Sequence, residues 1–573
     1  MLRSSLSFVC VLALFCPQLL SAAAKSPASI DGSIRRIGTG EVDSKPGVLI
    51  VGAVDARRQY ARTLAEEVAA QLQDAANSNP ALFDNVTYYV YSQPSPDAAS
   101  RATSQPLWED ATNHTPADDD RDGAIDEDGP EDINGDGLIT MMRVADTAGS
   151  YIPHPLDPRV IIPVQAEKGE VGQYSLYLEG MDNDHDERWN EDAPGGVDFN
   201  RNFPYDYPYF QPGAGAFACC ADESKALADW MWDHPNIAAV ITLGGDDNLR
   251  NLWPAGQASG AVLASPPAED QPYFEQVAKR LKEAAPREGS PEPTDQRGSL
   301  LKWAYLHYGR WAFGVDPWWP QPEKEKEKEK EKEKEQEESE IKQADQKAGE
   351  LEARAGGGDK EAEPKSPQQA EVSNETGAEK PKWDEKDKRG EYALNALKWM
   401  DKSGVDGYVP WTRVEQPDFH GRVVEVGGFK PYAIAPSGDE AKELAAQQTK
   451  FAQSVAAMLP RIEFTNGWME ALGKGVYRIR LTLVNTGELP TMPEMGEITR
   501  VPYPLQVTIT LPKDATLLAG RQRERLPRIP GGGGSVERTW LVRMPTGGDF
   551  AVTAHAPSVG TAIKSVKVYG GAQ

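Results

Sequence analysis

An Asn-Arg pair within residues 196–204 offers the clearest chemistry in this sequence. The segment reads Gly-Val-Asp-Phe-Asn-Arg-Asn-Phe-Pro. The planar guanidinium of Arg201 can donate two parallel hydrogen bonds to a carboxylate, and the amide of Asn200 adds a further donor. The segment therefore predicts a site that grips a carboxylate group.

The same run resembles the carboxylate clamp of the zinc carboxypeptidases, the carboxypeptidase A-like peptidases. In that family such an Asn-Arg pair holds the C-terminal carboxylate of a peptide. The resemblance covers about residues 47–316, and it implies substrate contacts for Asn200 and Arg201. It also assigns Arg143 to a family arginine that precedes the clamp and binds a carboxylate or stabilises an oxyanion. Peptide or protein C-termini are the partners that the resemblance implies.

The resemblance places the family's three zinc ligands, two His and one Glu, at Asp55, Arg58 and Gly244. A carboxylate at Asp55 can bind a metal, but the cation of Arg58 would repel Zn²⁺ and Gly244 has no side chain. Asp246 or Asp247 is the alternative ligand on the second loop. None of the seven His residues stands at a ligand position. We therefore predict that the family's zinc site is degenerate in this chain.

The resemblance places Asp316 at the family's general base, which is a Glu. The change keeps the carboxylate but shortens the side chain by one methylene, and general-base catalysis depends on that reach. The family's mobile Tyr has no counterpart shortly before Ser299. Without zinc to polarise a carbonyl and activate water, the clamp can bind a peptide but has nothing to attack it with.

Three interpretations follow from these residues. The first is a secreted carboxypeptidase-like protein that has lost catalysis and binds C-terminal carboxylates. The second is an active metallocarboxypeptidase whose metal is held in an atypical way by Asp55 with Asp246 or Asp247. The third is an extracytoplasmic structural or interaction protein in which the clamp has no role. The sequence leaves open whether the chain is an enzyme, and the loss of the zinc ligands favours the first interpretation.

Three acidic loops repeat oxygen side chains in the way that calcium sites do. They lie within residues 116–140 and 182–192, and each lacks the bidentate Glu that closes an EF-hand loop. Because Asp, Asn and Gly also favour turns without a metal, the alternative is a set of solvated acidic turns. The candidate calcium ligands are Asp118, Asp120, Asp122 and Asp126 in the first loop, Asp132, Asn134 and Asp136 in the second, and Asp182, Asp184 and Asp186 in the third.

The formal charge of −27 argues against nucleic acid and anionic membranes as partners. Residues 1–24 combine Arg3, a short apolar run and an Ala-rich end, which is typical of a cleavable secretory signal. No later segment is apolar enough for stable membrane insertion. We therefore expect an exported protein, periplasmic or extracellular. Its two remaining cysteines, Cys219 and Cys220, are adjacent and are expected to be thiols rather than a bridged pair.

The elements that must position these residues have an α/β pattern. Buried apolar runs predict strands at 47–54, 237–243 and 311–315, and helical spacing predicts helices at 57–72, 225–232 and 301–308. Together with the resemblance, this predicts a carboxypeptidase-like mixed sheet flanked by helices over residues 45–322. Residues 323–388 have too few apolar residues to form a core and read as a charged low-complexity insertion. Residues 389–435 are expected to complete the domain.

The last part of the chain, residues 462–573, changes to patterns of period two. Apolar and polar residues alternate at 477–483 and 505–511, turn signals stand at 485–487 and 531–534, and further strands are expected at 539–544, 550–554 and 563–568. These patterns predict a C-terminal all-β sandwich, which offers a surface for a protein partner.

Overall fold

The structure of this chain is a computed structural model that describes residues 30–321 and 387–569, apart from residues 120, 191, 257, 260, 261 and 466. The expected signal at residues 1–24, nearly all of the expected insertion and the candidate ligand Asp120 therefore lie outside the described residues. Within the described ranges, no helix combines the length and the apolar character that a membrane crossing requires.

A five-stranded sheet forms the centre of the molecule, in the order β1-β3-β2-β8-β11. Its strands are β1 (Arg35–Ile37), β2 (Gly47–Val51), β3 (Thr87–Tyr91), β8 (Ile237–Leu243) and β11 (Trp311–Val315). β1 is antiparallel to β3, whereas β3, β2, β8 and β11 run parallel. All residues of these four strands are buried, as expected for parallel strands covered on both faces. The predicted mixed sheet is confirmed.

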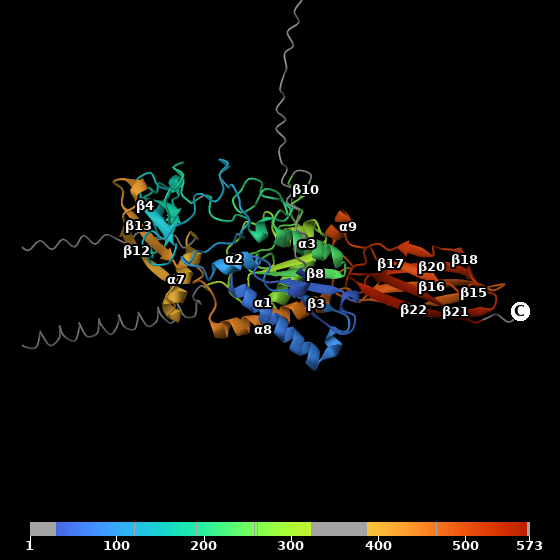
Figure 1. Cartoon of the computed structure of the whole chain (residues 1–573). Coiled ribbons are helices and arrows are strands. Elements are labelled where there is room, and N and C mark those ends of the chain that lie inside the picture. Colours follow the sequence, from blue (N-terminus) through green and yellow to red (C-terminus); the bar gives the residue numbers. More distant parts are fainter. Residues whose placement is uncertain are drawn as a thin grey trace, which may run out of the picture.

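Helices cover both faces of this sheet (Figure 1). α1 (Tyr60–Ser78) buries Leu64, Val68 and Leu72 at a spacing of four residues and packs against α8 (Gly438–Met458), which also contacts α4 (Gln271–Ala284). α3 (Asp222–Asp233) and α5 (Leu300–Leu306) lie together near the other face, where the Tyr308 hydroxyl donates to the carbonyl of Met231. α1 begins three residues later than predicted, because residues 55–58 form a turn.

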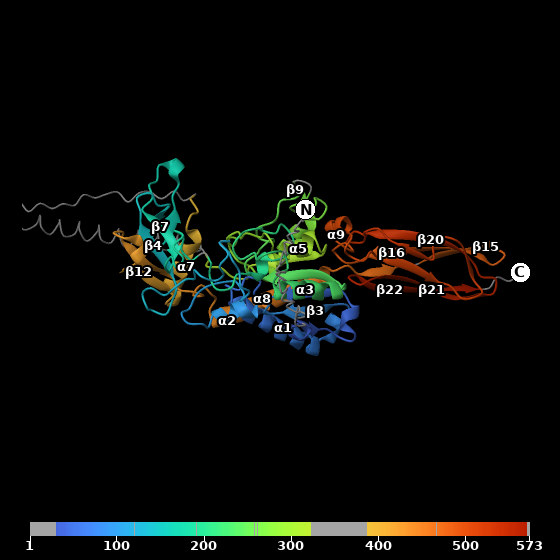
Figure 2. The ribbon, with the colours of Figure 1, turned by 45° about the horizontal axis from the view of Figure 1, so that its top comes forward.

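A second sheet of six strands was not predicted from the sequence. Its order is β12 (Tyr408–Val414), β13 (Val424–Phe429), β4 (Met141–Ala145), β7 (Tyr174–Leu178), β5 (Tyr151–Pro153) and β6 (Ile161–Pro163). Residues 389–435 therefore pair with strands that precede the insertion, away from the central sheet. Leu397 of α7 (Glu391–Ser403) packs on Val160 and Ile162 of this unit. Figure 2 shows the second sheet at one end of an elongated molecule.

The predicted C-terminal sandwich is confirmed and lies at the opposite end (Figure 1). One antiparallel sheet contains β14 (Ile462–Phe464), β15 (Trp468–Gly473), β16 (Val476–Asn485), β20 (Ser535–Arg543) and β18 (Thr516–Ala519). The other contains β19 (Arg523–Arg525), β17 (Gln506–Thr510), β21 (Gly547–Ala556) and β22 (Gly560–Tyr569). Their inward residues form one core around Trp540. The buried Asp270 of the central domain pairs with Arg528 of this unit at 3.0 Å.

The remaining regular elements are short and connect these units. They are α2 (Pro96–Arg101), α9 (Glu494–Thr499), β9 (Ala258–Ser259), β10 (Val262–Leu263) and the 3₁₀ turns η1 (Ile30–Ser33), η2 (Val42–Ser44), η3 (Pro80–Phe83), η4 (Ala166–Lys168), η5 (Phe199–Arg201) and η6 (Pro417–Phe419).

Candidate carboxylate-binding site

Loops from distant parts of the chain meet at the carboxyl end of the central sheet. β2, β8 and β11 are parallel neighbours, so the residues that follow them emerge at the same edge. Asp55 and Arg58 follow β2, Gly244 follows β8 and Asp316 follows β11. The clamp segment reaches the same edge through η5, where the side-chain amide of Asn200 donates to Asp246 at 2.9 Å.

The guanidinium of Arg58 lies where the three predicted zinc positions converge. Its Nη1 is 3.1 Å from Oδ2 of Asp316, and its Nε is 3.7 Å from Oδ2 of Asp55. A Cβ atom placed on Gly244 would lie 3.7 Å from both Cβ and Cδ of Arg58. Burial opposes the charge of Arg58, but the attractions of Asp316, Tyr60 and Asp55 together outweigh it and raise the pKa of Arg58 well above its ordinary value.

Asp316, the predicted general base, is fully buried beneath this cation. The hydroxyl of Tyr60 donates to its Oδ1 at 3.1 Å, and the backbone N–H of Trp318 donates to the same atom at 3.4 Å. Burial raises the pKa of Asp316, and Arg58 acts in the opposite direction. The carboxylate is therefore an internal partner of Arg58, and it does not line the pocket described below.

The residues at this edge do not fit a zinc ion. The carboxylate of Asp55 already accepts hydrogen bonds from the backbone N–H and the guanidinium of Arg57, and it also faces Arg58. Both carboxylate oxygens of Asp246 are bonded, one to the Thr294 hydroxyl at 2.7 Å and one to Asn200. Gly244 supplies no ligand atom, and a guanidinium cannot coordinate a metal cation. The potential metal ligands that remain are carboxylates that already accept hydrogen bonds, and they lie beside Arg57 and Arg58.

Asp247, the other alternative ligand, is equally occupied. Its Oδ1 accepts from the backbone N–H of Arg250 and its Oδ2 accepts from the guanidinium of Arg250 at 2.8 Å. The backbone N–H of Asp316 donates to the same Oδ2 at 3.2 Å. Asp247 thus connects the loop after β8 to the end of β11. Its role is structural.

Beside this edge lies a polar cavity of about 270 Å³. We call it the clamp pocket, and its lining residues are Asp55, Arg57, Asp198, Asn200, Arg201, Gly245, Asp246, Thr294 and Asp295. Its carboxyl groups outnumber its guanidinium groups, and burial raises the pKa of Asp198 to about 7 and that of Asp246 to about 6. The pocket can therefore hold protons near neutral pH and becomes less negative as the pH falls.

Arg201 reaches this pocket with part of its guanidinium unused. Its Nη1 lies 3.4 Å from Asp295, a carboxylate that Arg297 holds more closely at 2.6 Å. The Nε of Arg201 is buried and has no hydrogen-bond partner in the described part of the chain. A buried guanidinium N–H without an acceptor is costly, and a carboxylate can satisfy Nε and a neighbouring Nη together. The guanidinium of Arg201 thus keeps hydrogen-bonding capacity that the described residues do not use.

Asn200 lines the clamp pocket, but both of its side-chain polar atoms are already bonded. Its Nδ2 donates to Asp246, and its Oδ1 accepts from the backbone N–H of Leu300 at 3.1 Å. Its own backbone N–H donates to Asp198 at 2.8 Å, because Asp198 caps η5. Asn200 therefore bridges the two carboxyl groups that flank Arg201 and fixes the clamp segment to the sheet edge.

Arg143 does not line the clamp pocket. It lies on β4 of the second sheet, where Glu425 of β13 accepts from its guanidinium at 2.8 Å. The rings of Tyr174 and Trp411 lie 4.7 and 4.5 Å from the guanidinium carbon. Chain order suggested a neighbour of the clamp, whereas the pairing of β4 with β13 and β7 carries Arg143 into the second sheet.

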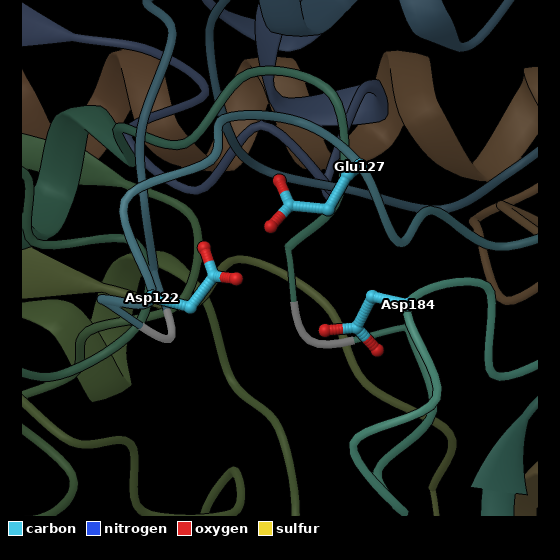
Figure 3. Close-up of side chains that lie close together, drawn as sticks. All are labelled: Asp122, Glu127 and Asp184. Atoms are coloured by element: carbon cyan, nitrogen blue, oxygen red, sulfur yellow. The ribbon is translucent and has the colours of Figure 1, made fainter.

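The first and third acidic loops bring their carboxylates together, as Figure 3 shows for Asp122, Glu127 and Asp184. One oxygen from each lies within 4.8 Å of the others, and Asp128, Asp182 and Asp184 form a second group of the same kind. Both carboxylate oxygens of Glu127 are buried without a hydrogen-bond partner among the described residues. Glu127 was not among the predicted ligands, because it falls outside the alternating pattern.

The other predicted calcium ligands have different surroundings. Asp132 accepts from the backbone of Gly135, Asp136 and Gly137 within its own loop, and Asn134 donates to Asp136. Asp186 pairs with Arg188 at 3.3 Å. Asp118 lines a different cavity. Asp126 accepts from the backbone N–H of Gly195 at 3.0 Å, which ties the first loop to the start of the clamp segment.

Several residues of the site could not be found by sequence reasoning. Arg57 lies between Asp55 and Arg58, two of the predicted zinc positions, but nothing in the sequence shows that it faces the pocket. Thr294 and Tyr60 carry no motif, and they reach the site only through the fold. Asp198 is part of the clamp motif, and its capping position before η5 was the available signal.

Comparisons with known proteins matched two segments of the chain to family models. Residues 173–318 match the family model for zinc carboxypeptidase, and residues 461–567 match a domain of unknown function, DUF8731. No curated protein shows a significant match to the chain. The predicted resemblance to the zinc carboxypeptidases is confirmed over residues 173–318.

Solved carboxypeptidase-related structures show only distant similarity. Bovine thrombin-activatable fibrinolysis inhibitor in complex with tick carboxypeptidase inhibitor is 11% identical with a TM-score of 0.29, over 49% of this chain and 73% of that chain. Carboxypeptidase A from Helicoverpa armigera is 13% identical with a TM-score of 0.28, over 50% and 56%. A putative carboxypeptidase A from Shewanella denitrificans OS-217 is 10% identical with a TM-score of 0.25, over 49% and 50%. The chain thus spans about half the length of the last two.

Replacing Arg58 by Met should destabilise the fold by roughly 3 kcal/mol, because Asp316 is left as a buried charge without its partner. A second substitution, Asp316→Asn, should recover part of the loss by removing that charge. Denaturant unfolding of the two variants measures both effects. The matched control is Arg62→Met on α1, whose exposed pair with Glu66 should contribute less than about 1 kcal/mol. An equal cost for both Met variants would contradict the structural role of Arg58.

The raised pKa of Asp198 predicts a pH-dependent stability. Because burial raises this pKa from 3.8 to about 7, the folded protein binds a proton that the unfolded chain has released, and stability falls as the pH rises between about 4 and 7. In Asp198→Asn, which keeps the acceptor for the Asn200 N–H, the unfolding midpoint should fall less over this range. Asp295→Asn is the control, since the Asp295 pKa is lowered to about 2 and its profile should parallel the wild type. Parallel profiles for Asp198→Asn would refute this assignment.

Proposed function

We propose that this protein is a non-catalytic carboxypeptidase-like protein that binds the C-terminal carboxylates of peptides or proteins in the clamp pocket. The observation that carries the proposal is the buried Nε of Arg201, which lacks an acceptor and belongs to a guanidinium that lines the pocket. A terminal carboxylate supplies the missing acceptor with the planar geometry that a guanidinium prefers.

The absence of hydrolysis is part of the same proposal. A metallopeptidase needs a Lewis acid beside an open coordination position and a base that reaches the attacking water. Arg58 occupies the region of the expected ligands, and Asp316 is buried against it. Neither group can perform the corresponding step, so the bound peptide is held and released intact.

Calorimetric titration with short peptides tests this function. Peptides with a free C-terminus should bind at least tenfold more tightly than the same peptides with a C-terminal amide, and Arg201→Ala should remove this difference, since one charge-assisted hydrogen-bonded contact contributes about 1.5–3 kcal/mol. Arg297→Ala is the matched control, because Arg297 also contacts Asp295 but does not line the pocket.

Two results would replace the proposal with an alternative interpretation. Stoichiometric zinc in the purified protein, together with release of C-terminal residues that chelators abolish, would favour an active peptidase with an atypical metal site. Peptide binding that is unchanged in Arg201→Ala would favour a structural or interaction protein, for which the sandwich is the remaining surface for a partner.

We also propose that calcium joins the first and third acidic loops. The support is the convergence of carboxylates around Asp184 and the pair of unsatisfied buried oxygens on Glu127. Carboxylate oxygens are the ligands that Ca²⁺ prefers. Asp192 binds the backbone N–H groups of Asp119 and Asp126, and Asp126 binds that of Gly195, so an ion in these loops would brace the clamp segment.

Calcium should raise the thermal unfolding midpoint by roughly 5 °C at a hundredfold excess over its dissociation constant, and EGTA should reverse the shift. Asp184→Asn should abolish the response, because Asp184 belongs to both carboxylate groups. Asp439→Asn, a fully exposed carboxylate on α8, is the control and should respond like the wild type. Asp132→Asn shows whether the second loop contributes. A calcium response that survives in Asp184→Asn would rule out this site.

Export belongs to the proposal as well. The signal-like segment at residues 1–24 supports a periplasmic or extracellular protein. A mature N-terminus near residue 25, determined on protein recovered from the producing cells, is the corresponding measurement.

A further inference from the structure

One loop beside the clamp pocket exposes three large aromatic side chains. We call residues 207–217 the aromatic loop. Tyr209 is 64% exposed, Phe210 is 72% exposed and Phe217 is 61% exposed. The rings of Tyr209 and Phe210 lie 6.1 Å apart. Apolar side chains gathered on a surface in this way mark places where proteins bind partners.

The aromatic loop is held in one shape by its own hydrogen bonds. The hydroxyl of the buried Tyr207 donates to the carbonyls of Ala214 and Gly215 at 2.7 and 2.6 Å. The side-chain amide of the buried Asn202 donates to the carbonyls of Ala214 and Phe217. Phe210 itself adopts a left-handed backbone, with φ at 66°. Such strain persists only where the surroundings fix the conformation, so the rings are displayed by a preorganised loop.

A cavity of about 470 Å³ lies between the aromatic loop and the first acidic loop. Val197, Phe210 and Phe217 supply apolar lining, and Arg121 contributes a cation that lies 4.1 Å from the ring centre of Phe210. Apolar walls with a few polar groups are typical of cavities that bind part of a ligand.

This cavity and the clamp pocket share one wall. Val197 lines the cavity, whereas Asp198 and Arg201 of the same segment line the clamp pocket. Gly213 of the aromatic loop packs directly against them, since a Cβ on Gly213 would lie 3.6 Å from Cδ of Arg201 and 3.5 Å from Cβ of Asp198. The backbone of Gly213 also accepts from the N–H of Asp198 at 2.8 Å. A polypeptide that reaches Arg201 therefore comes close to the aromatic loop.

We infer that the aromatic loop binds an apolar side chain that precedes the C-terminus of the polypeptide held at Arg201. The inference rests on the proposed function and defines its ligand class as C-terminal segments with an aromatic or large aliphatic residue a few positions before the end. An extended chain advances about 3.3–3.6 Å per residue, so residues one to four positions before the terminus lie roughly 3–14 Å from the bound carboxylate.

The test uses a set of six-residue peptides made of Gly and Ser, each with a free C-terminus. A single Phe is placed one, two, three or four positions before the terminal residue, and each peptide is also made with a C-terminal amide. Binding to the full chain is measured by calorimetry. One Phe position should increase affinity by roughly tenfold, because a Phe side chain is removed from water there.

Variants of the aromatic loop test whether this loop causes the increase in affinity that Phe produces. Phe217→Ser and Phe210→Asn should each reduce the gain, and Asn is chosen at 210 because it tolerates a left-handed backbone. Both residues are exposed, and the thermal midpoint of each variant reports whether the fold is intact. Tyr503→Ser is the matched control, since Tyr503 is a similarly exposed aromatic outside the loop; it should leave the gain unchanged.

The outcomes separate this inference from the proposed function. If free C-termini bind through Arg201 but no Phe position improves affinity, or the improvement survives in both loop variants, the inference is overturned and the carboxylate site stands. If Phe improves binding equally in the amidated peptides, the loop acts without a C-terminus and the inference is likewise overturned. If neither the free C-terminus nor Arg201 matters, the proposed function itself fails.

Discussion

The ion pair between Arg58 and Asp316 is the contact on which the chemistry of this site depends. Removing two charges from water costs free energy, and a buried pair is tolerated only where further hydrogen bonds satisfy the remaining atoms. Tyr60 and the Trp318 N–H donate to Oδ1 of Asp316, whereas among the described residues Oδ2 has only the charge of Arg58 beside it, and Asp55 lies 3.7 Å from the Nε of Arg58. The positive charge at the carboxyl edge of the sheet thus comes from a side chain of the protein, that of Arg58.

A guanidinium and a zinc ion allow different chemistry at such an edge. Zinc offers an open coordination position and lowers the pKa of a bound water, which generates a nucleophile. A guanidinium keeps its proton at all physiological pH values and acts only through charge and hydrogen bonds. The ionisable groups whose pKa values approach neutrality are instead Asp198 and Asp246 in the clamp pocket. These two groups, and not Arg58, can therefore take up or release a proton near neutral pH.

The parts of the fold that the sequence predicts well are those set by local pattern. The strands at 237–243 and 311–315 were predicted with their observed bounds because they are continuous apolar runs buried on both faces. The sandwich was predicted because its long strands, such as β16 and β21, bury one face. The second sheet was missed because several of its strands are only three to five residues long and because β13 pairs with β4 across the insertion. Arg143 was misplaced for the same reason, since chain order carries no information about which sheet a strand joins.

The clamp segment and the expected metal positions are held by different contacts. Arg201 is positioned by η5, and η5 is fixed by Asn200, which bonds to Asp198, Asp246 and the Leu300 N–H. None of these contacts involves Asp55, Arg58, Gly244 or Asp316. The hydrogen bonds that fix η5 are therefore independent of the expected metal positions, although Asp55 and its partner Arg57 line the same pocket. Binding without hydrolysis, as proposed for this protein, requires the contacts around η5 and does not require a metal site.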